Sequence, residues 1–382
     1  MTFWQIIKRE LHQIFIEDSR RVTFLFGAGI AYLLLFGGLY YNSTVTHIPL
    51  VICDEAQSSL SRQLVRNLDY DERFKIVAEV TSEEEMQRLI NEKVVYAAVD
   101  IPADLSKKVR TGSYATILCM VDGSNLVTTS ASSIAMMDSI QDLSNKVAIE
   151  NVSLKAGLSY EDAKKKVEPV ECNLRVLGNP TQSYLQFFVL GLAMIAMQQG
   201  LFFSVGASIQ KEYTLAKFKL LTKKINFDKL LVVKFLIYWV MSMLAFGVIT
   251  LLARNIFYIT NKGSLSSTLL LSGTFFFTAV SLGMCLSAIF SREIYFVRAA
   301  LIYVVPAFIL SGYTWPLESM DLYSGTLAKF SPFTYMGNSI RRLFFTGTLT
   351  DMWQTLSILA CMGIFFLVVC RFMFRRRLRK WQ

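Results

Sequence analysis

The sequence lacks most of the side chains on which enzyme active sites and nucleotide sites depend. Among its 382 residues are two histidines, His12 and His47, and six cysteines that follow no metal-binding spacing. Because a long apolar stretch separates the two histidines, a histidine-based triad or a histidine-rich metal site is excluded. No G-x-x-x-x-G-K-[ST] phosphate loop occurs either, so the chain has no P-loop for hydrolysing ATP.

Charged side chains are absent from six stretches of at least 19 residues each. These stretches are residues 22–41, 181–209, 235–253, 264–291, 299–317 and 352–370. A helix needs about 20 mainly apolar residues to cross about 30 Å of hydrocarbon, where its backbone must satisfy its own hydrogen bonds. Together with 53% hydrophobic residues overall, the pattern predicts a polytopic α-helical membrane protein with six transmembrane helices. The stretches also lack the ionisable residues that mark proton-coupled transporters.

The net charge of +10 is distributed unevenly along the chain. Nineteen Lys and Arg residues precede the first stretch, join the second to the third and the fourth to the fifth, or follow the sixth. The short loops on the opposite side carry five, which are Arg254, Lys262, Lys329, Arg341 and Arg342. Because short loops rich in Lys and Arg stay cytoplasmic, both termini are expected to be cytoplasmic. This placement accounts for the basic excess without a nucleic-acid partner.

Charged residues return in the insertion 42–183, between the first and second stretches. Runs with strand-like patterning at 48–53, 74–80, 94–101, 115–121 and 169–177 alternate with helical patterns at 58–68, 82–91, 103–110 and 125–158. The alternation predicts an α/β extracytoplasmic domain of about 140 residues, large enough for its own core.

The insertion offers acidic and thiol groups but no clear catalytic pattern. Its acidic residues at predicted strand ends are Asp54, Glu55, Asp100, Asp104 and Asp122. Turn and cap chemistry explains them more simply than catalysis does. Cys53 and Cys119 are compatible with a disulfide and equally with two free thiols.

Two segments beside the long stretches have distinct patterns. Residues 2–18 are amphipathic, with apolar side chains on one side, which suits a helix lying in the headgroup plane or a soluble terminal helix. Arg175-Val-Leu-Gly-Asn-Pro180 leads into the second stretch, where Pro180 disfavours helix at Asn179 and sets a boundary.

Two further segments lie at the ends of later charge-free stretches. The basic segment 210–234 begins Gln-Lys-Glu-Tyr-Thr-Leu, and a basic face toward anionic headgroups would explain its charge. The fifth stretch ends in Leu310-Ser-Gly-Tyr-Thr-Trp-Pro-Leu-Glu-Ser-Met320, where Gly312 and Pro316 should break a helix near the membrane surface.

Taken together, these features resemble the permease subunits of bacterial type-2 ABC exporters, in particular a multidrug-efflux-like subgroup with a large periplasmic domain. By this resemblance residues 1–21 are a cytoplasmic elbow helix and 22–41 the first transmembrane helix. Residues 42–183 are then the periplasmic domain, 184–376 the other five transmembrane helices, and 377–382 a basic cytoplasmic tail.

The resemblance also implies roles for particular residues. A cytoplasmic coupling loop at 210–234 would contact an ATPase subunit through Lys211, Glu212, Tyr213, Thr214 and Lys217, although the Gly that the family usually has there is missing. The external re-entrant region 311–345 would form a gate. Its expected residues are Ser311, Gly312, Tyr313, Pro316 and Met320, and Asn179 with Pro180 would form the second-span entry.

The expected function is therefore that of a permease subunit in the bacterial inner membrane, which exports drugs or other amphipathic, lipid-like compounds. ATP and Mg²⁺ would bind the separate ATPase subunits, and this chain would need no cofactor. Further expected partners are a second permease copy or paralogue, a periplasmic adaptor and an outer-membrane channel. The alternatives are a multi-span receptor or anchor and, third, an intramembrane enzyme.

Overall fold

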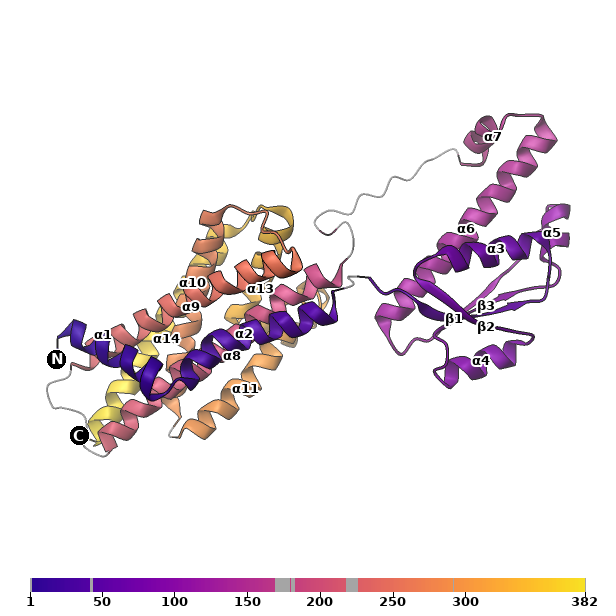
Figure 1. Ribbon diagram of the computed structural model, residues 1–382. Helices are drawn as coiled ribbons and strands as arrows, with labels where there is room; N and C mark the ends of the chain where they lie inside the picture. The colour runs from indigo at the N-terminus through magenta and orange to yellow at the C-terminus, as the bar shows by residue number, and fades with distance from the viewer. Residues whose placement is uncertain are drawn as a thin grey trace. The chain divides into compact units, whose positions relative to one another are not determined.

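The chain divides into two compact units, which are described separately below. The computed structural model describes residues 2–381 except 42–43, 169–178, 180–182, 218–225 and 291. One unit comprises Met1–Ser43 with Val176–Gln382, and the other comprises Thr44–Arg175. The first contains the long helices and the second a small α/β fold (Figure 1).

Five helices among the described residues are long and apolar enough to cross a membrane. They are α2 (Arg20–Leu39), α8 (Tyr184–Lys217), α9 (Phe227–Phe257), α10 (Leu265–Ile289) and α14 (Met352–Trp381). They run side by side in one bundle (Figure 1). Since each overlaps a charge-free stretch, the prediction of a polytopic α-helical membrane protein is confirmed.

The remaining charge-free stretch, 299–317, is helical only in part. α11 (Glu293–Ile309) begins before it, with Arg298 in its first two turns, and ends well before residue 317. The chain then turns through Gly312, whose φ of +81° favours glycine. The predicted helix break at Gly312 is confirmed, and the charge-free stretch continues past it because the uncharged residues Ser311 and Tyr313 are buried in a turn inside the protein.

Short helices follow this turn. They are the 3-10 helix η2 (Leu317–Ser319), α12 (Leu322–Ala328) and α13 (Pro332–Thr346). Asp321 caps α12 by accepting from the backbone N–H groups of Tyr323 and Ser324. Pro332 opens α13, where its missing N–H costs nothing.

Several segments predicted as loop, tail or single helix differ from expectation. Residues 210–217 continue α8 and 227–234 open α9, so a loop over all of 210–234 is wrong at these residues, while 218–225 lie outside the described residues. Residues 377–381 likewise continue α14. Charged residues such as Lys, Arg and Glu extend a helix once it is nucleated.

The N-terminal amphipathic segment is not one uniform helix. α1 (Phe3–His12) is followed by a π-helical turn, Gln13–Glu17, and Asp18 interrupts the helix before α2. Thr2 and Gln5 form a reciprocal capping box at the start of α1. The break lets the chain change direction between α1 and α2.

Close packing in the bundle depends on glycine at helix crossings. α2 lies along α8, and α14 lies along α10. A Cβ at Gly200 of α8 would come within 2.0 Å of the Phe24 carbonyl oxygen of α2. Without a side chain at this position the two backbones approach closely, as membrane helices commonly do at small residues.

The second unit is built on a four-stranded sheet with strand order β2-β1-β3-β4. Its strands are β1 (Ile48–Asp54), β2 (Phe74–Val80), β3 (Ala97–Ile101) and β4 (Leu118–Val121); β4 alone runs antiparallel to its neighbour. Its helices are α3 (Ser59–Tyr70), α4 (Glu83–Asn91), α5 (Leu105–Thr111), α6 (Leu126–Ala156) and α7 (Tyr160–Val167). α3 and α6 lie over one face and α4 over the other (Figure 1).

These elements follow the sequence patterns closely, with two exceptions. The strand pattern at 169–177 lies outside the described residues, and the sequence patterns did not indicate α7, which Ser159 caps. The Thr-rich start of α6 is helical because the Asn125 side chain accepts hydrogen bonds from the N–H groups of Val127 and Thr128.

The sheet register excludes a disulfide between Cys53 and Cys119. Strand β3 lies between them, with Asp100 opposite Cys53 and Val99 opposite Cys119. Two strand spacings put the Cα atoms about 10 Å apart, beyond the range of a disulfide. The two side chains also pack on opposite faces, and both thiols are free.

Candidate functional site

A buried ionic cluster joins four helices of the membrane unit. Glu10 of α1, Arg21 of α2, Glu212 of α8 and Lys234 of α9 are each at most 2% exposed. Lys234 Nζ lies 2.5 Å from Glu10 Oε2 and 3.1 Å from Glu212 Oε1. One ammonium group therefore bridges two carboxylates that are about 200 residues apart in sequence.

Further donors complete the cluster. Arg9 Nη2 donates to both Glu212 carboxylate oxygens, at 2.6 and 2.8 Å. The Ser208 hydroxyl donates to Glu10 Oε1 at 2.5 Å and accepts from Lys234 Nζ at 2.7 Å. Such charges remain ionised in a low-dielectric interior only while each has its partners. The cluster thus fixes α1 against the adjoining ends of α8 and α9.

The predicted coupling residues lie beside this cluster, with different exposures. Glu212 is a member of it, and Tyr213 is buried, with the Arg377 guanidinium 4.7 Å from its ring centroid. Lys211 pairs with Glu17, and the exposed Thr214 donates its hydroxyl to the Gln210 carbonyl at 3.2 Å. Lys217 is the last residue of α8, and its side chain lies outside the described residues.

Of the cluster, only Glu212 was predicted from the sequence. Its other members were not among the expected site residues: Arg9, Glu10, Arg21, Ser208 and Lys234. One signal was present, since Glu10 lies among the apolar residues of the amphipathic helix α1. Their partners could not be identified without the fold.

At the other end of the bundle, Asn179 caps the approach to α8. Its Oδ1 accepts from the Ser183 N–H at 3.0 Å, and its Nδ2 donates to the Ser183 carbonyl at 3.1 Å. Pro180 lies outside the described residues. The contacts of Asn179 are structural and offer no reactive group.

The turn after α11 is held by a network around Tyr313. The Tyr313 hydroxyl donates to the Phe187 carbonyl of α8 at 2.6 Å, and burial raises the pKa of its phenol, so it stays a donor. Arg341 Nη1 donates to the Tyr313 carbonyl at 2.9 Å, and its guanidinium lies 4.9 Å from the Tyr313 ring centroid. The Asn338 amide donates to the Ser311 carbonyl at 3.0 Å. α13 and α8 therefore hold the turn from both sides.

Glycine is required at two positions in this network. Besides its φ of +81°, Gly312 has no room for a Cβ, which would meet Leu317 and Asn338 within 2.7 Å. At Gly191 of α8 a Cβ would meet the Tyr313 ring at 2.4 Å. Of the other predicted gate residues, Pro316 is exposed and Met320 is partly buried, so neither belongs to the network.

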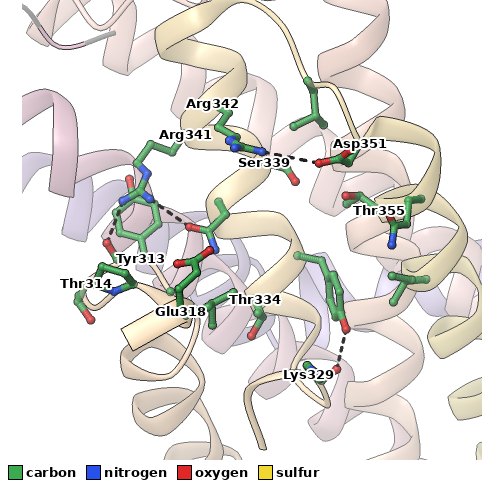
Figure 2. A pocket seen from close by; sticks show the side chains of 18 of the residues that line it. Tyr313, Thr314, Glu318, Lys329, Thr334, Ser339, Arg341, Arg342, Asp351 and Thr355 are labelled. Carbon is green, nitrogen blue, oxygen red and sulfur yellow. Dashed lines mark hydrogen bonds and ion pairs between the residues drawn. The ribbon is translucent and has the colours of Figure 1, made fainter. Parts of the chain in front are cut away.

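A cavity of about 770 Å³ opens beside this turn. It is lined by the turn and η2, by α13, and by the first turns of α14 (Figure 2). Its charged lining residues are Glu318, Lys329, Arg341, Arg342 and Asp351. Figure 2 shows Arg341 directed toward Tyr313 and Arg342 toward Asp351. The volume is in the range of small-molecule sites.

The chain is similar to known transport proteins over most of its length. Residues 20–370 match the family described as ABC-2 family transporter protein. The Escherichia coli (strain K12) protein named "Probable multidrug ABC transporter permease YbhR" is 20% identical over 366 residues, which cover 94% of this chain and 95% of that protein. ABC transporter G family member 20 of Dictyostelium discoideum is 22% identical over 218 residues, covering 55% of this chain and 30% of that protein.

Proposed function

The chain belongs to the ABC-2 family of transporter proteins and is the transmembrane permease subunit of an ABC exporter, and we propose how this subunit is arranged in the membrane and where its energy comes from. Membership implies an ATPase subunit and a further permease copy as partners. The observation that carries the proposal is a family match over 20–370 in a chain that has no P-loop of its own. Energy then comes from ATP and Mg²⁺ bound by the partner ATPase.

Six transmembrane helices are proposed, with α11 added to the five long ones. Its 17 residues span about 26 Å at 1.5 Å per residue, close to the hydrocarbon thickness. The distribution of Lys and Arg supports cytoplasmic termini in the inner membrane, with α1 and the ionic cluster at the cytoplasmic end. The α/β unit Thr44–Arg175 is then periplasmic, since it follows α2 in the chain.

The ATPase subunit is proposed to dock at the cytoplasmic end, on the exposed side of α1 and the end of α8. Lys211 and Thr214 supply accessible groups there, whereas Glu212 and Tyr213 act from inside by holding α8 against its neighbours. Because the ionic cluster joins α1, α8 and α9, a push on α1 would move the two transmembrane helices with it.

Affinity purification of the tagged chain from its native membrane tests the docking. A P-loop ATPase should accompany the wild-type chain, and the double variant Lys211→Glu, Thr214→Asp should recover much less of it. The matched control, Arg254→Glu with Lys262→Glu, reverses charge at the opposite end of the bundle and should leave recovery unchanged. A chain that purifies without any nucleotide-binding partner would favour the receptor or anchor alternative instead.

The periplasmic unit is proposed to engage an adaptor that leads to an outer-membrane channel. The similarity to a protein named as a multidrug permease supports amphipathic or lipid-like compounds as cargo. Deletion of residues 50–170 should abolish export of such compounds while the ATPase subunit still co-purifies. Unchanged export after the deletion would rule out this role.

A further inference from the structure

The cavity beside Tyr313 collects positive charge that is scarce on its side of the bundle. The short loops at this end carry five basic residues, and Lys329, Arg341 and Arg342 all line the one cavity. Lys and Arg residues in loops on the external side weaken the charge bias that orients the protein in the membrane. Their convergence on one cavity therefore indicates a local use for the charge.

Of the three basic residues, Arg341 is already engaged in the structure. It donates to Tyr313 and Asn338 and lies over two aromatic rings. Among the described residues, the Lys329 ammonium has no ion pair, and Arg342 has only Asp351, at 3.9 Å with both side chains about 60% exposed. An exposed pair of that length contributes little to stability, so Arg342 and Lys329 remain available to a ligand.

Two acidic side chains balance these two cations. Glu318 lines the cavity and forms no ion pair with any described residue, and Asp351 has the long contact to Arg342. A simple anion would be repelled by both carboxylates. A ligand that carries a phosphate and an ammonium group would satisfy the two cations and the two acids together.

Two hydroxyl groups on the cavity wall give a second, independent indication of a polar ligand. Ser339 of α13 and Thr355 of α14 are only 5% and 8% exposed, and both line the cavity (Figure 2). Neither hydroxyl is hydrogen-bonded to any other residue in the described part of the chain. The hydroxyl oxygens themselves are accessible from the cavity, near Arg342 and Asp351, where they can donate to phosphate oxygens.

The position of the cavity matches the depth of lipid headgroups. Phe187 in the first turn of α8, the turn after α11 and the start of α14 all line it, so it lies at the ends of membrane-crossing helices. Leu317, Leu349 and Ile358 add apolar wall against which a glycerol backbone and the first acyl carbons can pack. Its volume of about 770 Å³ exceeds what a headgroup alone needs.

From this arrangement we propose that the cavity binds a phospholipid headgroup in which a phosphate is joined to a primary amine, as in phosphoethanolamine. Arg342 binds the phosphate with the hydroxyls of Ser339 and Thr355 assisting, and Lys329, before the other end of α13, adds positive charge to the cavity wall. Glu318 and Asp351 accept hydrogen bonds from the ammonium group. The site lies within a single copy of the chain, and it goes beyond the proposed function by naming a ligand class.

Lipid binding to the purified full-length chain in nanodiscs, followed by native mass spectrometry, tests the proposal. Discs would contain phosphatidylcholine with a minor share of either phosphatidylethanolamine or phosphatidylglycerol. We expect selective retention of phosphatidylethanolamine, because the quaternary amine of phosphatidylcholine cannot donate hydrogen bonds and phosphatidylglycerol has no amine. The double variant Lys329→Gln, Arg342→Gln should bind it about tenfold more weakly, as expected for lost charged hydrogen bonds.

Controls separate a site from general effects of charge and folding. The variant Arg254→Gln, Lys262→Gln removes the other two basic residues on the same side and should retain wild-type selectivity. Thr355→Val preserves shape and should still weaken binding, which guards against misfolding of the double variant. Equal retention of all three lipids, or equal loss in the control variant, would overturn the proposal.

The source of the headgroup is distinguished by a soluble probe. Glycerophosphoethanolamine that competes with the lipid, with the same sensitivity to Arg342→Gln, would show that the headgroup chemistry alone suffices and that a soluble ligand can use the site. Competition by inorganic phosphate as strong as that by glycerophosphoethanolamine would overturn the role of the amine. Failure of ATPase co-purification would affect only the proposed function, because these measurements need no ATPase.

Discussion

At the residue scale, the most consequential feature is a lysine that bridges two buried carboxylates. Lys234 contacts Glu10 and Glu212 with almost no exposure to solvent. Such a group stabilises the fold only when every buried charge has its partners, because the cost of desolvating the charges opposes the attraction between them. Removing one partner is therefore far more costly than never having had the pair.

The variant Lys234→Met should destabilise the chain by about 3–5 kcal/mol, because it leaves two buried carboxylates with fewer partners. The double variant Lys234→Met, Glu10→Gln should recover part of this loss, since the second change removes one uncompensated charge. Thermal unfolding of the four chains of this cycle in detergent measures the coupling. Additive effects of the two substitutions would contradict a direct interaction.

A second residue-scale prediction concerns Asp122 in the α/β unit. The Lys93 ammonium, 2.6 Å away, and the N–H and hydroxyl of Ser124 lower the pKa of its carboxyl to about 2. Because this value is below that of an unfolded chain, about 3.9, the contact stabilises the fold above about pH 4, and the stabilisation is lost as the pH falls toward 2.

Pepsin cleavage within Thr44–Arg175, compared between wild type and Asp122→Asn across pH 2–5, checks this expectation. The variant should be cleaved faster at pH 5, and the difference should shrink as the pH falls toward 2, where about half of wild-type Asp122 is protonated. Glu83→Gln, on the surface of α4, is the matched loss of one acid and should cause no such difference. A gap between variant and wild type that is as large at pH 2 as at pH 5 would point to altered packing.

At the element scale, helix ends and helix crossings decide where the chain can turn and how closely it packs. Gly312 lets the chain turn after α11, and Gly200 lets α8 approach α2. Both effects come from the absence of a Cβ, one through the backbone angle and the other through contact distance. Glycines elsewhere in the bundle need not have this role.

Gly200→Ala should therefore destabilise the bundle by about 1–3 kcal/mol, because the new methyl group overlaps the Phe24 carbonyl and forces α2 away from α8. Gly247→Ala in α9 is the matched control, since a Cβ there meets no atom within 4 Å. That substitution should be neutral or slightly stabilising, because alanine favours helix. Thermal unfolding in detergent compares them, and equal melting temperatures would show that α2 and α8 adjust freely.

At the scale of the whole molecule, the two units follow different physical rules. The helical unit is apolar over long stretches and is organised by the bilayer, whereas Thr44–Arg175 forms its own core on both faces of a sheet. The proposed topology predicts that α1 and the α/β unit face opposite sides of the inner membrane.

Single cysteines introduced into a chain without native cysteines should report the sidedness. A cysteine at Ser113, in the α/β unit, should react with a membrane-impermeant maleimide in cells whose outer membrane is permeabilised. A cysteine at Lys8 on α1 should react only after the inner membrane is disrupted. Labelling in the opposite order would show that the topology is the reverse of the one proposed. Equal labelling of both cysteines before the inner membrane is disrupted would show that no membrane separates them.

Sequence patterns anticipated much of the fold, and the reasons differ by element. The strand over Phe74–Val80 and the helix begun by Ser82 depend on alternation and capping, which are local properties. Gly312 indicated where α11 ends, whereas the absence of charge alone did not, because a buried turn is as free of charge as a membrane helix. Of the expected coupling residues, Glu212 and Tyr213 proved to be internal.

Long apolar helices, an inserted α/β segment and the lack of a P-loop motif can all be read from the sequence, because hydropathy, periodicity and motif spacing are properties of neighbours along the chain. Which charges meet can be known only from the folded chain. Glu10 and Lys234 are 224 positions apart, and the charges of the cavity come from η2, from α13 and from the residues that follow α12 and precede α14. Such contacts arise from helix packing, where the requirement to pair buried charges acts between residues that no local pattern connects.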